Sequence, residues 1–262
     1  MRYLATLATC AALGANATTA TTDFSDLWFN SNEEGWGMNI IQQNDIQFIT
    51  LFVYGPTGQP TWYVASAVRY TGQDSNGVVG FSGTLYATTG PYFGSPTFNE
   101  ASVALRPVGG IAFAASEVSG GVVSYTVDGT SVTKSVRRQT WKLENLNGSY
   151  LGATVGTYSG CGATRNGYIE APITLTMGHD GGSTISMREQ GSNYSCNYTG
   201  TYSQEGRMGR ITGSGTCTDG TTQSFAASEV QLNITSLVFR FDATFSGTCR
   251  FSGRMGGIRR EN

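Results

Sequence analysis

Apolar and polar residues alternate with a period of two along most of the chain from Trp36 onward, and clusters of Gly, Pro, Asn and Asp interrupt the alternation at short intervals. Alternation of this kind, bounded by turn residues, predicts β-strands with one buried face. In the first half we expect strands near residues 36–43, 46–54, 59–68, 77–87, 98–106, 109–117, 121–128 and 131–142. Turn residues at 44–45, 56–58, 109–110 and 128–129 would join neighbouring antiparallel strands.

A polar break at residues 144–148 separates this set from a second one. Its strands are expected near residues 149–159, 170–178, 183–190, 194–203, 207–217, 222–230, 233–243 and 246–255. A short strand every ~8–12 residues indicates a sandwich or an up-and-down barrel rather than βαβ units. We therefore predict an all-β chain of two consecutive antiparallel units of about eight strands each, more readily barrels than sandwiches. The domains would be residues 18–145 and a disulfide-bonded unit at 146–262.

One hexapeptide occurs twice in the chain. The residues Phe113 to Val118 recur identically as Phe225 to Val230. Both copies fall in the sixth strand predicted for their half, which favours duplication of one β unit. The rest of the two halves aligns poorly, so a chance repeat stays open as the alternative.

The composition agrees with a β protein and excludes some partners. The chain has 36 Gly, 13 Tyr and 13 Phe but only 13% charged residues, which suits pleated strands and tight turns. Its formal charge of -2 lacks the basic excess that nucleic-acid binding requires. No apolar run of about 18 residues follows the N-terminal segment, so we expect no transmembrane segment.

The N-terminus has the three parts of a secretory signal peptide. Arg2 precedes an apolar stretch from Leu4 to Ala15, and an Ala-x-Ala site ends at Ala17. We expect residues 1–17 to be removed, with cleavage at Ala20 as an alternative, and an ordered N-terminal helix as the competing interpretation. Cleavage predicts a secreted, periplasmic or cell-surface protein.

Four cysteines remain after such cleavage, and an even number in an exported protein predicts disulfides. Cys196 and Cys217 are equidistant from a turn at residues 206–207, so they would face each other across a hairpin. Cys161 and Cys249 would then join the first and last strands of the second unit, which are neighbours in a closed barrel. If the hairpin were out of register, the pairs would exchange. Without Cys-x-x-Cys spacing or further histidines, we expect no metal and no cofactor.

No catalytic constellation is recognisable. The single histidine, His179, lies between glycines and is expected at a solvated hairpin tip, which supports a catalytic triad poorly. A glycosidase needs two carboxylates facing one sugar, but the adjacent Glu33 and Glu34 would point to opposite faces of an extended segment. Glu117 and Glu229 are interpreted as rim charges or turn acceptors. The enzyme question stays open, with a non-enzymatic protein favoured.

Aromatic residues gather in residues 27–37, 60–63 and 88–94. Rings beside Asn and Glu side chains can stack on sugars or enclose an apolar ligand. The candidate ligand-binding residues are therefore Trp28, Glu33, Trp36, Trp62 and Tyr92. As the alternative, favoured for Trp36 and Trp62, the large rings fill the barrel core and Trp28 packs over its end.

The same residues carry a resemblance to a known group. Residues 32–37 are similar to an N-E-S-G-W-G turn, with Glu34 replacing the Ser, and residues 54–63 to a Y-x-x-x-G-x-P-x-W-Y hairpin. Residues 88–94 match T-T-G-P-x-F-G. Over about residues 26–142 the chain thus resembles a group of uncharacterised exported bacterial proteins. The resemblance implies an exported bacterial protein and brings no activity with it.

These observations favour an exported, non-enzymatic binding protein for a glycan or a small apolar ligand, bound at a barrel mouth lined by the candidate aromatic residues. The alternative is a structural or self-assembling cell-surface or extracellular protein that associates through strand edges or an apolar patch. A carboxylate-based hydrolase ranks third. An outer-membrane barrel is disfavoured, because Gly and Ser occur on both strand faces.

Overall fold

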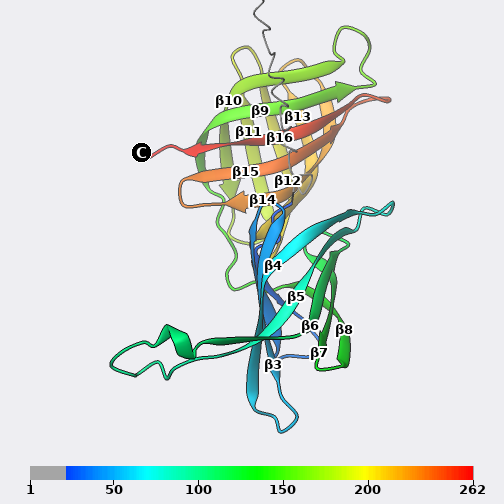
Figure 1. The fold of residues 1–262 in the computed structure, drawn as a ribbon. Helices are drawn as coiled ribbons and strands as arrows, with labels where there is room; N and C mark the ends of the chain where they lie inside the picture. Colours follow the sequence, from blue (N-terminus) through cyan, green and yellow to red (C-terminus); the bar gives the residue numbers. More distant parts are fainter. Residues whose placement is uncertain (1–21, 262) are drawn as a thin grey trace, which may run out of the picture.

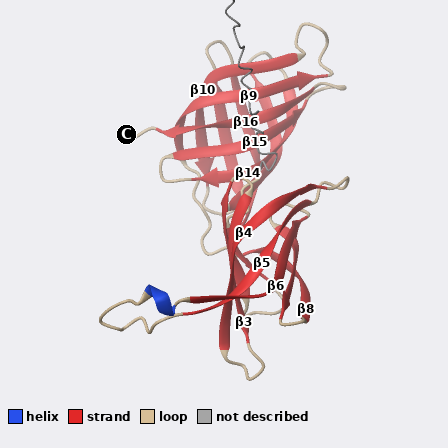
Figure 2. Cartoon of the chain, viewed as in Figure 1, coloured by secondary structure: helices blue, strands red, loops and turns tan. Residues whose placement is uncertain are grey.

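The computed structural model describes residues 22–261, and the predicted signal peptide with Cys10 lies outside this range. These residues form two consecutive closed barrels of eight antiparallel strands each, which confirms the predicted fold class and favours barrels over sandwiches (Figure 1). Within residues 22–261 the sole helical element is the short 3-10 turn η1 (Glu100–Ser102), on a long connection that projects from the N-terminal barrel (Figure 2).

The strands of the N-terminal barrel pair in chain order, each with the next. They are β1 (Asp26–Phe29), β2 (Gly37–Gln43), β3 (Ile46–Tyr54), β4 (Pro60–Gln73), β5 (Val79–Thr89), β6 (Ala104–Ala115), β7 (Gly120–Val127) and β8 (Thr130–Arg138). The barrel closes where β8 returns to β1, with Trp28 opposite Arg138. Inward side chains such as Ile49 and Leu51 on β3 are fully buried, as the period-two pattern predicts.

The C-terminal barrel has the same up-and-down order. Its strands are β9 (Gly148–Ser159), β10 (Gly167–His179), β11 (Thr184–Gln190), β12 (Ser195–Glu205), β13 (Met208–Cys217), β14 (Thr222–Leu232), β15 (Ser236–Thr244) and β16 (Arg250–Arg259). The barrel closes along ten residue pairs between β9 and β16. The predicted domain boundary after residue 145 falls in the link between β8 and β9.

The predicted strands agree closely with the second barrel and less well with the first. The count of eight in the first barrel arose from two compensating errors. Strand β1 was missed, because its four residues are too few to display alternation. Strand β6 was predicted as two strands with a turn at Gly109 and Gly110, but both glycines are paired with β5, and a bulge just before Gly109 shifts the register without ending the strand.

Both predicted disulfides are present. Cys196 and Cys217 are direct partners in the β12–β13 hairpin, whose turn is at Gly206 and Arg207, as predicted. The bond between Cys161 and Cys249 joins the end of β9 to the start of β16, the two strands that close the barrel. Each bridge therefore lies between neighbouring strands at one end of the barrel.

The repeated hexapeptide occupies equivalent places in the two barrels. Its first residues lie on β6 and β14, each the sixth strand of its barrel, and the rings of Phe113 and Phe225 point into the two cores. Both rings stack edge-on against another core aromatic, Trp28 in the first barrel and Tyr198 in the second. The repeat thus marks the same packing position twice.

A buried arginine anchors the junction between the barrels. The Arg138 side chain is fully buried, lies over the Trp28 ring at 4.9 Å, and its Nη1 donates to Asp26 Oδ2 at 3.1 Å. Burial lowers the pKa of Arg138. The same Asp26 oxygen accepts the backbone N–H of Arg207, at 2.9 Å, from the tip of the β12–β13 hairpin. One carboxylate therefore joins a core cation of the first barrel to the second barrel.

Candidate functional site

The C-terminal barrel contains a partly open cavity of about 210 Å³ at the end that carries both disulfides. All eight strands contribute to the walls, because inward side chains near that end do not fill the interior. The apolar part of the wall is mostly aromatic. The principal lining residues are Tyr158, Tyr194, Tyr198, Phe241, Phe245, Phe251, Ile169 and Met255.

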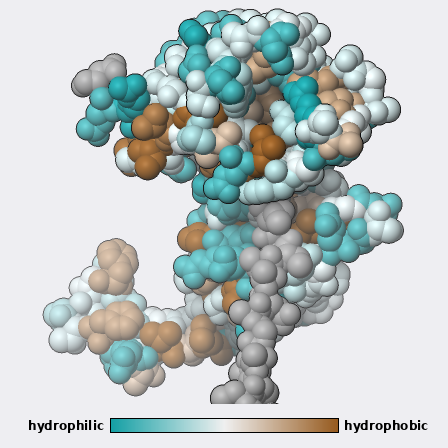
Figure 3. All heavy atoms as spheres, turned by 90° about the horizontal axis from the view of Figure 1, so that it is seen from above, coloured by the Kyte–Doolittle hydropathy of each residue, from teal (hydrophilic) through white to brown (hydrophobic). Residues whose placement is uncertain are grey.

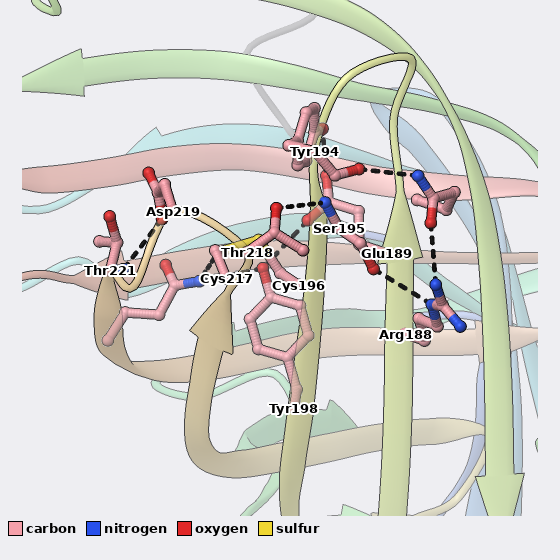
Figure 4. The surroundings of a disulfide bond; sticks show 12 residues. Arg188, Glu189, Tyr194, Ser195, Cys196, Tyr198, Cys217, Thr218, Asp219 and Thr221 are labelled. Carbon is pink, nitrogen blue, oxygen red and sulfur yellow. Dashed lines mark hydrogen bonds between the residues drawn. A yellow bond between two sulfur atoms is a disulfide. The ribbon is translucent and has the colours of Figure 1, made fainter.

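A buried carboxylate lies in the wall of this cavity. Glu189 occupies an inward position of β11, in line with the buried Ile185 and Met187, and is 3% exposed. Its Oε1 accepts hydrogen bonds from Thr154 Oγ1 at 2.9 Å and from the Tyr194 hydroxyl at 2.8 Å. Its Oε2 accepts one from the Tyr198 hydroxyl at 3.0 Å. Figure 4 shows this glutamate and the two tyrosines beside the Cys196–Cys217 disulfide.

The hydroxyl donors are held in the protonated form. Burial first, and then the nearby Glu189 carboxylate, raise the pKa of Tyr194 and of Tyr198 well above the usual range for tyrosine. Gln223 supports the network from β14, since its Nε2 donates to the Tyr198 hydroxyl at 3.0 Å. Glu189 therefore has fixed, neutral partners at neutral pH.

An arginine and the disulfides shape the rim. Arg165, from the β9–β10 connection, lies over the rings of Tyr158 and Phe245 at 4.7 Å from each centroid. Asp219 also lines the cavity, and hydrogen bonds from Thr221 first, and then the charge of Arg165, lower the pKa of its carboxyl. Because the Cys196–Cys217 bridge lines the cavity, this part of the rim is covalently held in shape.

Two of the sequence-predicted site residues are parts of the N-terminal core. Trp28 is fully buried, and its Nε1 donates to the carbonyl of Phe24 at 3.0 Å. Trp36 is half-buried and packs against the same core. Its Nε1 donates to Glu33 at 3.1 Å, and the other Glu33 oxygen accepts from Lys134 at 2.7 Å. The interpretation of Trp36 as a core residue agrees with this packing.

Trp62 does not fill the core, contrary to the favoured interpretation. It is 53% exposed on the outer face of β4, opposite the equally outward Phe52. The adjacent Tyr63 packs against the core instead, since neighbouring residues of a strand face opposite sides. Phe52 also lines an open groove on the outside of the barrel together with Trp36 and the 77% exposed Trp141.

Tyr92 lies on a different part of the N-terminal barrel, in the connection between β5 and β6. It is 68% exposed on the β5–β6 excursion, which we define as residues 90–103, and its ring lies against that of Phe93. Figure 3 shows apolar surface on the segment that projects sideways from the barrels. The structure thus brings Glu33 and Trp36 together but gathers neither Trp62 nor Tyr92 with them in one cavity.

His179 is not at a solvated tip as predicted. It ends β10 and is 7% exposed, with its ring edge-on to Tyr202. Its Nδ1 accepts the backbone N–H of Leu146 at 3.3 Å, and its Nε2 lies 3.0 Å from the carbonyl of Gly182. The contacts to backbone atoms explain its burial and assign it a role in closing the barrel end opposite the cavity.

The cavity was missed by the sequence reasoning, which concentrated on tryptophan. One signal was available: residues 184–190 alternate, and Glu189 falls on the face that carries Ile185 and Met187. A charged residue on the buried face of a strand is unusual unless it has a partner or a ligand. Among residues 22–261, no group of three or more His, Cys, Asp or Glu residues is arranged to hold a metal ion.

Comparison of the chain with models of protein families, and with curated proteins, found no match. In the described part of the chain, no helix has both the length and the apolar character needed to cross a membrane.

Proposed function

We propose that the chain is an exported, non-enzymatic binding protein that takes a small, largely apolar ligand into the cavity of the C-terminal barrel. The observation that carries the proposal is the partly open cavity of about 210 Å³ with aromatic walls and a buried polar network. Ligand pockets typically combine apolar walls with a few fixed polar groups. Two disulfides and the N-terminal sequence pattern support export to an oxidising compartment.

The size of the cavity limits the ligand. A cavity of about 150 Å³ lined by apolar side chains accommodates benzene. The cavity here therefore has room for one ring with a short substituent, whereas larger ligands would require Arg165 to leave the rings of Tyr158 and Phe245. Glycan binding has less support, because the five sequence-predicted residues do not share one cavity.

Calorimetry with a panel of one-ring compounds tests the proposal. Ala171 lines the cavity, so Ala171→Phe should fill part of it and abolish binding. Ala226→Phe is the matched control, since Ala226 lies between two inward residues of β14 and so on the outer face, and it should bind as the original protein does. Absence of binding to every compound, or equal binding by both variants, would contradict the proposal.

A second candidate function, self-assembly, is favoured by the β5–β6 excursion. Phe93 is 94% exposed and Phe98 is 71% exposed, so one projecting segment presents two large apolar side chains to solvent. Light scattering at increasing protein concentration tests this role. Assembly that disappears in a Phe93→Ser variant would support it, and a monomer at all concentrations would count against it.

A further inference from the structure

The C-terminal barrel contains two buried glutamates that differ in their partners. Glu229, 5% exposed, faces two arginines: Arg254 Nη2 is 2.8 Å from Oε2, and Arg240 Nε is 3.8 Å from Oε1. Glu189, 3% exposed, takes part in no ion pair within 4.0 Å among residues 22–261. Burial of a carboxylate without a counter-charge is costly. Glu189 lines the aromatic cavity, whereas the ion-paired Glu229 lines a separate, polar pocket with residues of the first half such as Glu117.

The hydrogen bonds of Glu189 leave room for one further donor. A carboxylate offers about four acceptor positions over its two oxygens. Oε1 accepts from Thr154 and Tyr194, whereas Oε2 accepts from Tyr198 alone. A ligand in the cavity can therefore supply a donor to Oε2 without displacing a protein group.

We infer that the ligand of this cavity is a small primary amine, bound as its ammonium ion with the charged group on Glu189. This inference rests on the proposed function and deepens it. An ammonium group supplies both the missing counter-charge and the missing donor. Aromatic rings favour a cation over their faces, and Tyr158, Phe241 and Phe251 line the same space. The volume restricts the body of the amine to about one ring.

The charges at the rim do not oppose entry of a cation. Among residues 22–261, Arg165 is the one arginine or lysine that lines the cavity, and it is accompanied there by the carboxyl of Asp219. The two rim charges are of opposite sign. Glu189, deeper in the wall, therefore determines the charge that the cavity favours.

The test compares phenethylamine with 2-phenylethanol, a neutral compound of nearly the same shape, by calorimetry on the full chain. The original protein should bind the amine about tenfold more tightly or better, because a charge-assisted hydrogen bond is stronger than a neutral one. Glu189→Gln keeps the shape of the side chain and should remove this preference. Glu229→Gln is the control: it alters the ion-paired glutamate and should retain the preference.

The outcomes separate the inference from the proposed function. Equal or tighter binding of 2-phenylethanol by the original protein would overturn the inference of an amine and indicate a neutral ligand. This measurement does not depend on the folding of any variant. A preference that survives in folded Glu189→Gln, checked by circular dichroism, would also overturn it. If neither compound nor any other one-ring compound binds, the cavity is not a binding site and both proposals fail.

Discussion

Removal of either disulfide should destabilise the C-terminal barrel, and the two losses should differ by a calculable amount. Cys161 and Cys249 are separated by 88 positions in the sequence, and Cys196 and Cys217 by 21. Loop-closure entropy then gives about 4.6 kcal/mol for the first bridge and about 3.3 kcal/mol for the second, if the unfolded chain is the state most affected. Each pair has one buried and one half-buried cysteine, so packing losses in Cys→Ala variants largely cancel in the comparison.

The four tryptophans make the assay specific to each barrel. Trp28, Trp36, Trp62 and Trp141 all precede the second barrel, so tryptophan fluorescence follows the first barrel while far-UV circular dichroism follows both. With a urea m-value of about 2 kcal/mol/M, the midpoint of the C-terminal barrel should fall by about 2.3 M without Cys161–Cys249 and by about 1.7 M without Cys196–Cys217. The fluorescence transition should stay in place.

Two results would refute this reasoning. An equal or greater loss on removal of Cys196–Cys217 would show that the length of the closed loop does not determine the stabilisation. A fluorescence transition that moves together with the circular dichroism transition would show that the barrels unfold as one unit through the Arg138 junction.

Two further predictions concern the barrels' interiors. Arg138→Met should lower the unfolding free energy of the N-terminal barrel by about 3 kcal/mol, measured by urea titration of tryptophan fluorescence, because it leaves Asp26 without its buried partner. The control, Arg137→Met, breaks an exposed pair with Glu205 and should cost less than about 1 kcal/mol; equal losses would contradict the role of burial. Burial, and then Glu144, raise the pKa of Tyr202 from 10.0 to about 12, so the neutral phenol is favoured in the folded state. Its contribution to stability should be complete below pH 10 and lost as the pH rises towards 12, and Tyr202→Phe should make the alkaline fall in the urea midpoint shallower.

The sequence predicted the second barrel better than the first, for a physical reason. Alternation is regular in residues 148–259, and the turn at Gly206 and Arg207 determines a register that sets Cys196 opposite Cys217. In the first barrel a bulge at Gly109 imitates a turn, and β1 is too short to show a period.

The candidate site was harder to predict, because a residue type does not reveal the face on which it lies. Of the adjacent Trp62 and Tyr63, only one could point inward, and in the structure it is Tyr63 that packs against the core. All four tryptophans lie in the first half of the chain, whereas the aromatic cavity lies in the second barrel. The inward position of Glu189 could be predicted from the alternation around it. The absence of a cation beside it could not, because only the three-dimensional structure shows that Arg240 and Arg254 pair with Glu229.

The two ends of the β12–β13 hairpin lie in different surroundings. Its turn, at Gly206 and Arg207, contacts Thr140 and Asp26 of the first half, whereas its open end carries the disulfide at the cavity rim. The eleven residues of β12 extend over roughly 30 Å along a tilted strand, so the attachment to the first half and the cavity lie at opposite ends of the second barrel. A tether attached through the N-terminal barrel would therefore leave the cavity end of the other barrel uncovered.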